Sequence, residues 1–196
     1  MGRPLEQIRA RSWFGWVARA PMVAFRLGLG RIVGHTFMVL TTTGRVTRRP
    51  RRTMVVFHDV GERKYVVGPY GLRSDWYRNL CADARVTVQT ASGAAAMTAR
   101  RVTDPDELVR VYELLARRGW VLRPYVAAQG IDGEPPGIAA AADRLLVVAF
   151  EPTTAVTPPP LRADLVWLWP LGAVALAIAL TARTRRATRA AHHRRR

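Results

Sequence analysis

The sequence predicts an α+β, mainly β fold, a small barrel with helices at its side. Three observations lead to this prediction. Short runs of β-branched and apolar residues alternate with turn residues along the middle of the chain. Two stretches carry helix-start signals. The order is strands, a helix, strands, a helix and a closing strand, which favours a barrel over a parallel sheet of βαβ units.

The predicted strands are short runs of β-branched and apolar residues. They are expected at residues 37–43, 52–58, 64–68, 85–90, 94–101 and 145–150. The first two runs flank a turn at Gly44, and a second hairpin turn is expected around Ser92 and Gly93. The polar residues 58–63 are predicted to form a turn between strands.

Two helix starts are marked by side chains that can cap a helix. Ser74 is a predicted N-cap with Asp75 in the first turn. Asp104 is a second N-cap, followed by Pro105 at N1 and by Glu107, which could complete a capping box. Residues 125–142 are rich in Ala, Gly and Pro and are predicted to be a loop or a poorly determined helix.

Outside the barrel, expected at residues 34–152, the composition divides the chain further. Residues 1–33 form a basic, aromatic-rich segment, either an interfacial membrane helix or a helix packed on its own domain. Residues 153–164 are a Pro-rich stiff linker. Residues 165–182 carry no charge and predict a transmembrane helix, with a surface-lying tail as the alternative. Residues 183–196 form an Arg-rich tail, which we expect to stay cytoplasmic. With a single span this would put the barrel on the opposite side, unless residues 1–33 also insert or the tail is re-entrant.

Positive charge dominates the chain and is dense at one turn. The net charge is +17, from 31 basic and 14 acidic residues. The turn between the first two predicted strands holds five arginines: Arg45, Arg48, Arg49, Arg51 and Arg52. Like charges crowded on one connection repel each other, so the pattern indicates an anionic partner such as a polyanionic small molecule, anionic lipid or nucleic acid.

The sequence shows no self-sufficient catalytic site. The four histidines lack the spacing of metal ligands, and the single cysteine, Cys81, excludes an intramolecular disulfide. No Gly-rich phosphate loop of the P-loop or dinucleotide type occurs. If the protein is an enzyme, a cofactor must therefore bring the reactive group.

Two motifs resemble those of the deazaflavin-dependent nitroreductase family. The first is Thr41-Thr42-Thr43-Gly44-Arg45 followed by Pro50-Arg51, and the second is Ser74-Asp75-Trp76-Tyr77-Arg78-Asn79-Leu80. The closing Phe150-Glu151-Pro152 is also similar, so the resemblance covers residues 34–152. It implies a split β-barrel that binds coenzyme F-420, with FMN as the less favoured option, and hydride transfer to quinones or nitroaromatics.

The resemblance also implies which residues hold the cofactor. Arg45, Thr47 and Arg51 should bind its phosphate, with help from backbone amides of the turn, and the 68–71 stretch should approach the ring. Val46 stands where some members carry a lysine, which Arg48 or Arg49 could replace. The full implied set is Thr43, Gly44, Arg45, Thr47, Arg51, Gly68, Tyr70, Gly71 and Trp76 for the cofactor, and Tyr125 for the substrate. An aromatic side chain on a short helix is also commonly core packing, which is the alternative for Trp76.

The leading hypothesis is a membrane-attached oxidoreductase that uses reduced deazaflavin and a lipophilic acceptor such as a quinone. The barrel is expected at the cytoplasmic face of the cell membrane, and a homodimer is a further expectation. Two rivals remain. One is a non-catalytic, membrane-anchored barrel that binds a flavin or another anionic ligand. The other is a lipid-binding or nucleic-acid-binding surface, of which the nucleic-acid form is disfavoured.

Overall fold

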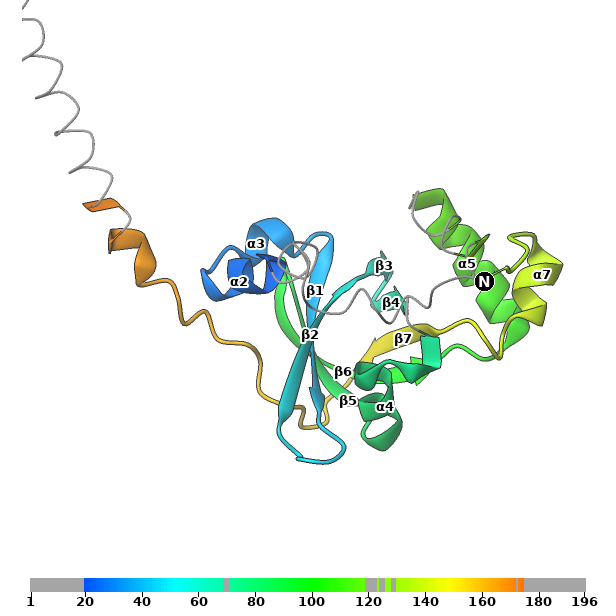
Figure 1. Cartoon of the computed structure of the whole chain (residues 1–196), viewed down its shortest axis with the longest axis horizontal. Helices are drawn as coiled ribbons and strands as arrows, with labels where there is room; N and C mark the ends of the chain where they lie inside the picture. The colour runs from blue at the N-terminus through cyan, green and yellow to red at the C-terminus, as the bar shows by residue number, and fades with distance from the viewer. Residues whose placement is uncertain are drawn as a thin grey trace, which may run out of the picture.

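A computed structural model describes residues 20–68, 71–118, 123, 126–127, 130–171 and 173–174. Its centre is one seven-stranded antiparallel sheet with the order β2-β1-β5-β6-β7-β4-β3 (Figure 1). The strands are β1 (Phe37–Thr43), β2 (Pro50–Val56), β3 (His58–Val60), β4 (Arg63–Val67), β5 (Arg85–Thr90), β6 (Gly93–Arg101) and β7 (Val147–Pro152).

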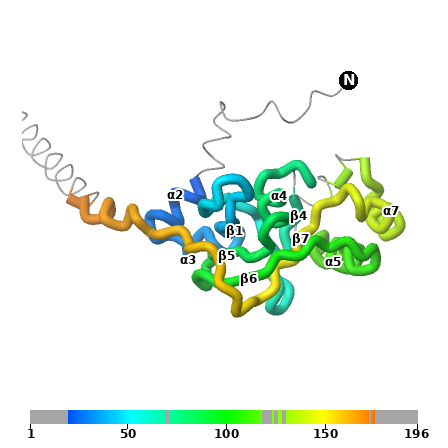
Figure 2. Tube along the Cα trace, turned by 90° about the horizontal axis from the view of Figure 1, so that it is seen from below, coloured from blue at the N-terminus to red at the C-terminus, as the bar shows by residue number. Residues whose placement is uncertain are grey.

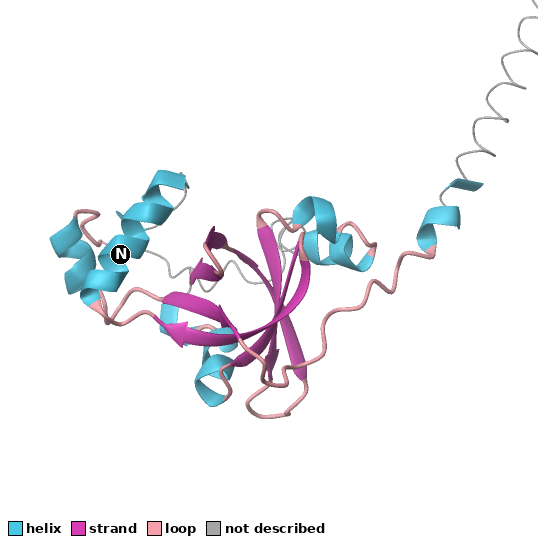
Figure 3. Cartoon of the chain, turned by 180° about the vertical axis from the view of Figure 1, so that it is seen from behind, coloured by secondary structure: helices cyan, strands magenta, loops and turns pink. Residues whose placement is uncertain are grey.

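The sheet curls until its two edges meet. Its edge strands, β2 and β3, follow each other in the chain with only Phe57 between them. Since one residue cannot bridge the width of a flat sheet, the strands must wrap around a common interior. Figure 3 shows the resulting crossing of strands. The predicted mainly β fold with flanking helices is therefore confirmed.

One strand was missed in the sequence. Residues 58–63 were predicted to be a turn, but His58–Val60 pairs with Arg63–Val67 as an antiparallel ribbon. The polar side chains of His58 and Asp59 hid this strand, because an edge strand does not need an apolar face.

The helices lie around the sheet (Figure 1). Those described are α2 (Ala20–Arg26), α3 (Gly30–Val33), α4 (Asp75–Ala82), α5 (Pro105–Arg118) and α7 (Pro135–Ala140), with a 3-10 turn at Gly71–Arg73. Asp104 caps α5 as predicted, accepting bonds from the amides of residues 106 and 107. Glu107 does not complete the capping box, because its carboxylate binds Arg100 at 2.8 and 2.9 Å. The Ser74 hydroxyl bonds Gly71 O instead of capping α4.

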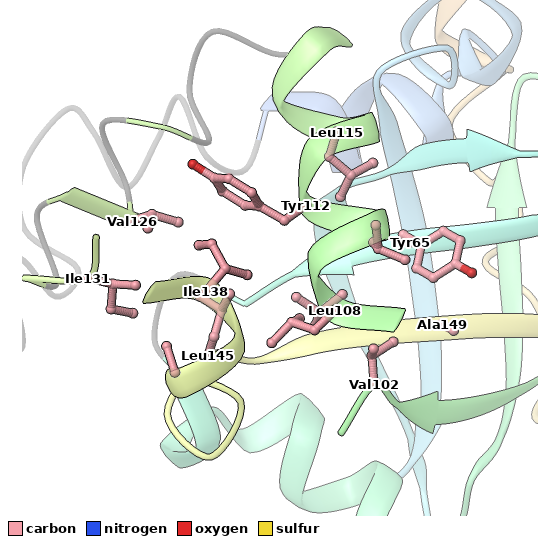
Figure 4. Packing of buried hydrophobic residues seen from close by; sticks show 13 residues of the cluster. Tyr65, Val102, Leu108, Tyr112, Leu115, Val126, Ile131, Ile138, Leu145 and Ala149 are labelled. Atoms are coloured by element: carbon pink, nitrogen blue, oxygen red, sulfur yellow. The ribbon is translucent and has the colours of Figure 1, made fainter. Parts of the chain in front are cut away.

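Both faces of β7 are buried, which explains its continuous apolar sequence. Val148 and Phe150 point into the barrel, while Val147 and Ala149 face α5 and α7. Figure 4 shows this second cluster, in which Leu108 lies between the helices and the sheet. Two separate clusters therefore anchor the helical flank and the barrel interior.

Residues 153–163, which we call the strap, lie along the outer surface of the sheet (Figure 2). The side-chain amide of Gln89 donates to Leu161 O at 3.0 Å and accepts from Leu161 N at 2.6 Å. The hydroxyls of Thr87 and Thr157 are 2.7 Å apart. The Pro-rich stretch is thus bonded to the barrel along much of its length.

Half of the predicted transmembrane helix at residues 165–182 lies outside the described residues. Residues 168–171 and 173–174 are helical. No helix within the described ranges is long and apolar enough to cross a bilayer. The predicted helical segment at residues 1–33 is described only from residue 20 onward, where it contains α2 and α3.

Candidate functional site

Residues 44–52, which we call the arginine hairpin, comprise the turn between β1 and β2 and the first three residues of β2. The turn lies at the end of the barrel remote from α2 and α3 (Figures 1 and 3). The connection is closed by two backbone bonds, from Gly44 N to Arg49 O at 2.9 Å and from Arg48 N to Gly44 O at 2.8 Å. Arg48 adopts a left-handed conformation with φ of 54°. The loop is therefore a compact turn with a defined backbone, and not a loose tip.

Gly44 is closely surrounded by other groups at the base of this turn. A Cβ atom there would lie 3.0 Å from Arg49 O, 3.1 Å from Arg51 Cγ and 3.2 Å from Thr47 Oγ1. These distances are tighter than ordinary van der Waals contact, so a side chain would displace the groups around it. The predicted residues Gly44, Thr47 and Arg51 are in fact brought together.

Asn79 of α4 ties the two ends of the arginine hairpin together. Its Oδ1 accepts from both the backbone N and Nη1 of Arg45, each at 3.2 Å. Its Nδ2 donates to Thr42 Oγ1 at 3.2 Å, and that hydroxyl donates to Arg51 O at 3.3 Å. Only 5% of Asn79 is exposed, and its bond to Thr42 is fully buried, where a hydrogen bond is electrostatically stronger than in water.

The five arginines of the hairpin differ in what holds them. Arg45 also pairs with Asp75 at 3.1 Å, and Arg52 bonds the carbonyls of the strap. Arg51 donates to Thr47 Oγ1 at 3.4 Å. Within the described part of the chain, Arg48 and Arg49 make no side-chain hydrogen bond or ion pair, and both are exposed. Among the described carboxylates, Asp75 pairs with Arg45 and the charge of Asp164 interacts with Arg52. The five guanidinium groups still outnumber these acids, so the turn remains cationic.

Thr43, beside the arginine hairpin, and Gly68, on β4's side of the barrel, have other neighbours. The Thr43 hydroxyl approaches Asp83, whose pKa is lowered chiefly by the hydrogen bond from Arg85 and to a smaller extent by Thr43. Gly68 is buried against Leu146, where a Cβ would come within 2.5 Å of Leu146 Cδ2. Packing therefore explains this glycine without a ligand.

Gly71 and Trp76 flank the entry to α4. Gly71 has φ of 57°, and a Cβ built there would meet nothing within 4 Å. The same holds for Gly61, Gly93 and Gly130, so the role of Gly71 in approaching the cofactor ring stays a prediction. Trp76 is half-buried against the barrel interior and meets Tyr77 edge to face at 6.3 Å between ring centres. Tyr70 and Tyr125 lie outside the described residues.

Asn79 is the residue to which sequence reasoning gave no role. It stands inside the second motif, but its spacing shows only that it is on a short helix. The available signal was a polar side chain on the face of α4 that also carries Leu80, which is the face turned to the barrel. A buried amide in that position needs partners, and the hairpin supplies them.

The fold and the cationic turn define a barrel protein that can hold an anionic ligand at one end of its sheet. Residues 20–125 match the model of the F420H(2)-dependent quinone reductase family. The chain therefore belongs to this family. It is an oxidoreductase whose cofactor is coenzyme F-420, as the two motifs implied.

The chain is only distantly similar to solved structures. One is described as an F420 reductase, with 20% identity, a TM-score of 0.37, and 61% of this chain and 87% of that chain covered. An F420-H2 dependent reductase, FDR-A, has 22% identity and a TM-score of 0.37, covering 59% and 92%. A FAD-binding protein from Mesorhizobium loti has 12% identity and a TM-score of 0.39, covering 61% and 82%.

Proposed function

We propose that this F420H2-dependent reductase passes reducing equivalents to a lipophilic acceptor, a quinone in the first place and a nitroaromatic as a second option, at a membrane surface. The arginine hairpin holds the phosphate and glutamate tail of the cofactor. The observation that carries this proposal is the surplus of guanidinium groups on a turn whose backbone is fixed by Asn79.

The donor chemistry of the turn fits such a tail. Guanidinium groups bind phosphates and carboxylates through two parallel hydrogen bonds, and several such groups suit a ligand with several negative charges. Arg51 and the Thr47 hydroxyl lie beside each other and can bind one phosphate together. Arg48 and Arg49 are available for further anionic groups. They could make the contact that a lysine makes in members of the family where this chain has Val46.

Arg45 has a different part in this arrangement. Its guanidinium is shared between Asn79 and Asp75, so it orients the turn and adds positive charge behind it. A bound anion can then interact with Arg45 without its having to move far. Fixed donors of this kind bind an anion without first paying for their own ordering.

When bound, the reduced deazaflavin ring supplies the hydride. The chain has to hold that ring, exclude water and leave room for the acceptor. The open backbone at Gly71 is a suitable approach for the ring, and Tyr70 and Tyr125 are proposed hydrogen-bond donors near the ring and the acceptor. No acidic or basic side chain of the protein is needed as a proton carrier in this proposal.

The composition of residues 165–196 supports the proposed membrane location. Residues 165–182 are uncharged and begin with two tryptophans, and the Arg-rich tail comes next. A quinone with an isoprenoid chain resides in the bilayer, so a reductase at the surface can reach it. We place the barrel on the cytoplasmic side of the cell membrane, and a homodimer stays a prediction.

The test is anaerobic oxidation of reduced F-420 by a short-chain, water-soluble quinone and by a nitroaromatic compound. We expect turnover with the quinone. Arg51→Ala should raise the KM for the cofactor while leaving kcat at saturation nearly unchanged. Arg144→Ala is the matched control, because it removes an exposed arginine far from the hairpin in sequence. Cofactor binding without oxidation by any quinone or nitroaromatic would refute the proposed acceptor class.

A further inference from the structure

We infer that α2, α3 and residues 164–174 together form a lipid-docking surface that seats the enzyme on an anionic bilayer. The inference specifies the membrane contact of the proposed function and rests on it. It depends on three features, which are the attachment of residues 164–169 to α2, the apolar side chains exposed there, and the absence of uncompensated acidic groups.

Residues 164–169 are fastened to the end of α2 by several bonds. Leu165 N donates to Arg26 O at 2.9 Å, and the indole Nε1 of Trp169 donates to Leu27 O at 2.9 Å. Val166 packs against Gly28, where a Cβ atom would lie 3.2 Å from Val166 Cγ2. The segment therefore has a fixed position on the helix pair, with the strap holding it to the sheet on its other side.

Large apolar side chains are exposed on both parts of this surface. Ile32 of α3 is 70% exposed and Trp167 is 59% exposed. The exposed apolar set of the surface is Val23, Ile32, Val166, Trp167, Leu168, Trp169, Leu171 and Val174. Such a concentration at one end of the molecule indicates a binding surface, since solitary exposed apolar residues are what an ordinary surface shows.

The charges around these side chains are suited to anionic lipid. Residues 20–36 contain Arg26 and Arg31 and no acidic residue. From residue 161 to the last residue, Asp164 is the only acidic one. Both of its oxygens accept from Arg26 at 2.8 Å, and this pairing lowers the pKa of the Asp164 carboxyl. Arg31 and Arg162 are exposed, so the surface is apolar and cationic.

This combination favours a bilayer over an acidic protein or nucleic acid. Tryptophan and arginine side chains are common at the boundary between lipid headgroups and acyl chains, and leucine and valine side chains insert below that boundary. An acidic macromolecule would use the arginines but leave Leu171 and Val174 in water. The uncharged sequence continues to residue 182, which lengthens the apolar part of the same segment.

The position of the surface agrees with the needs of the cofactor site. β1 begins at Phe37 beside α3 and ends at Thr43 beside the arginine hairpin. A strand of this length spans about 20 Å, so the two cationic regions lie at opposite ends of the barrel. Docking through α2 and α3 leaves the hairpin free to bind the cofactor tail instead of lipid headgroups.

The test is binding of the full chain to vesicles made of equal parts phosphatidylcholine and phosphatidylglycerol. Ile32→Glu and Trp167→Glu should each weaken vesicle binding at least about tenfold, because each removes a large apolar contact and adds a negative charge. Val156→Glu is the matched control, since Val156 is 87% exposed but lies on the strap. It should bind as the unaltered chain does. Equal binding by all three variants would overturn the inference.

A milder substitution gives a direct readout of contact. Vesicles with brominated acyl chains quench tryptophans that enter the bilayer, and Trp167→Phe combined with Trp169→Phe should remove much of that quenching. Unchanged quenching would show that these side chains stay out of the lipid and would also overturn the inference.

The reductase proposal can fail separately. Ile32→Glu should oxidise reduced F-420 with the soluble quinone at the normal rate without vesicles. If turnover is normal and neither Ile32→Glu nor Trp167→Glu changes the affinity for vesicles, the docking surface is refuted and the reductase proposal stands. If vesicle binding depends on these residues but no quinone is reduced, the surface stands and the proposed acceptor is refuted.

Discussion

Replacing Asn79 with alanine should weaken both the fold and cofactor binding. The substitution removes the acceptor of two bonds from Arg45 and the donor to Thr42. Because Thr42 is only 1% exposed, its hydroxyl is left poorly hydrated when the bond from Asn79 is lost, whereas the partly exposed guanidinium of Arg45 can bond to water.

The loss in unfolding free energy should be about 2–4 kcal/mol, from two neutral bonds and one to a partly exposed guanidinium. For a chain of this size that corresponds to a fall in melting temperature of about 5–15 °C. Affinity for F-420 should also fall, by about tenfold, because the ends of the arginine hairpin are no longer tied and must be ordered on binding.

Thermal unfolding followed by circular dichroism and a fluorescence titration with F-420 measure the two effects. Thr42→Val is the partial control, since it removes only the hydroxyl bonds and should cost less. Asn79→Asp keeps the acceptors for Arg45 and should retain most of the cofactor affinity. The reasoning fails if Asn79→Ala melts within about 1 °C of the unaltered chain and binds F-420 equally well.

Three further predictions concern packing, pH and the strap. Gly68→Ala should lower the free energy of unfolding by about 1–3 kcal/mol, because its Cβ would lie 2.5 Å from Leu146 Cδ2. In denaturant melts, Gly68→Ala combined with Leu146→Ala should lose less than the sum of the two single losses, because the smaller side chain makes room for the new Cβ. Arg100 lowers the pKa of the Glu107 carboxyl in the folded protein, so this ion pair stabilises the fold above the ordinary glutamate pKa of about 4.3. That stabilisation is lost as the pH falls further and the folded carboxyl is protonated, and Glu107→Gln should reduce the loss of unfolding free energy in this acid range. Gln89→Ala should speed amide exchange in the strap, which mass spectrometry can detect, and an unchanged rate would contradict the two bonds seen there.

Much of the sheet was predictable because its strands carry strong local signals. The runs at residues 37–43 and 85–90 were predicted with the observed limits, since both are β-branched and end at glycine or turn residues. β3 was missed because its polar residues pair only at an edge. The position of the strap was also beyond sequence reasoning, since the bond between Gln89 and Leu161 joins residues far apart in the chain.

The candidate site was predictable in its chemistry and less so in its geometry. Five arginines around one turn indicate an anionic partner whatever the fold. The sequence could not show that Gly68 leaves room for the Leu146 side chain, or that Asn79 holds Arg45, because both contacts form only when distant segments pack together. The motifs identified the turn after β1 and helix α4, and only the tertiary structure showed which residues of these elements contact one another.

The central claim is that the arginine hairpin binds the anionic tail of F-420. The most direct measurement is a titration of the purified full chain with F-420, repeated with Arg51→Ala, Arg48→Ala and the distant control Arg144→Ala. The account predicts that Arg51→Ala weakens binding by about 1.5–3 kcal/mol, that Arg48→Ala weakens it less, and that Arg144→Ala has no effect. The increase in Kd should shrink when the ligand lacks the glutamate and phosphate tail. Equal affinity of all four proteins for intact F-420 would contradict the claim and place the tail elsewhere on the barrel.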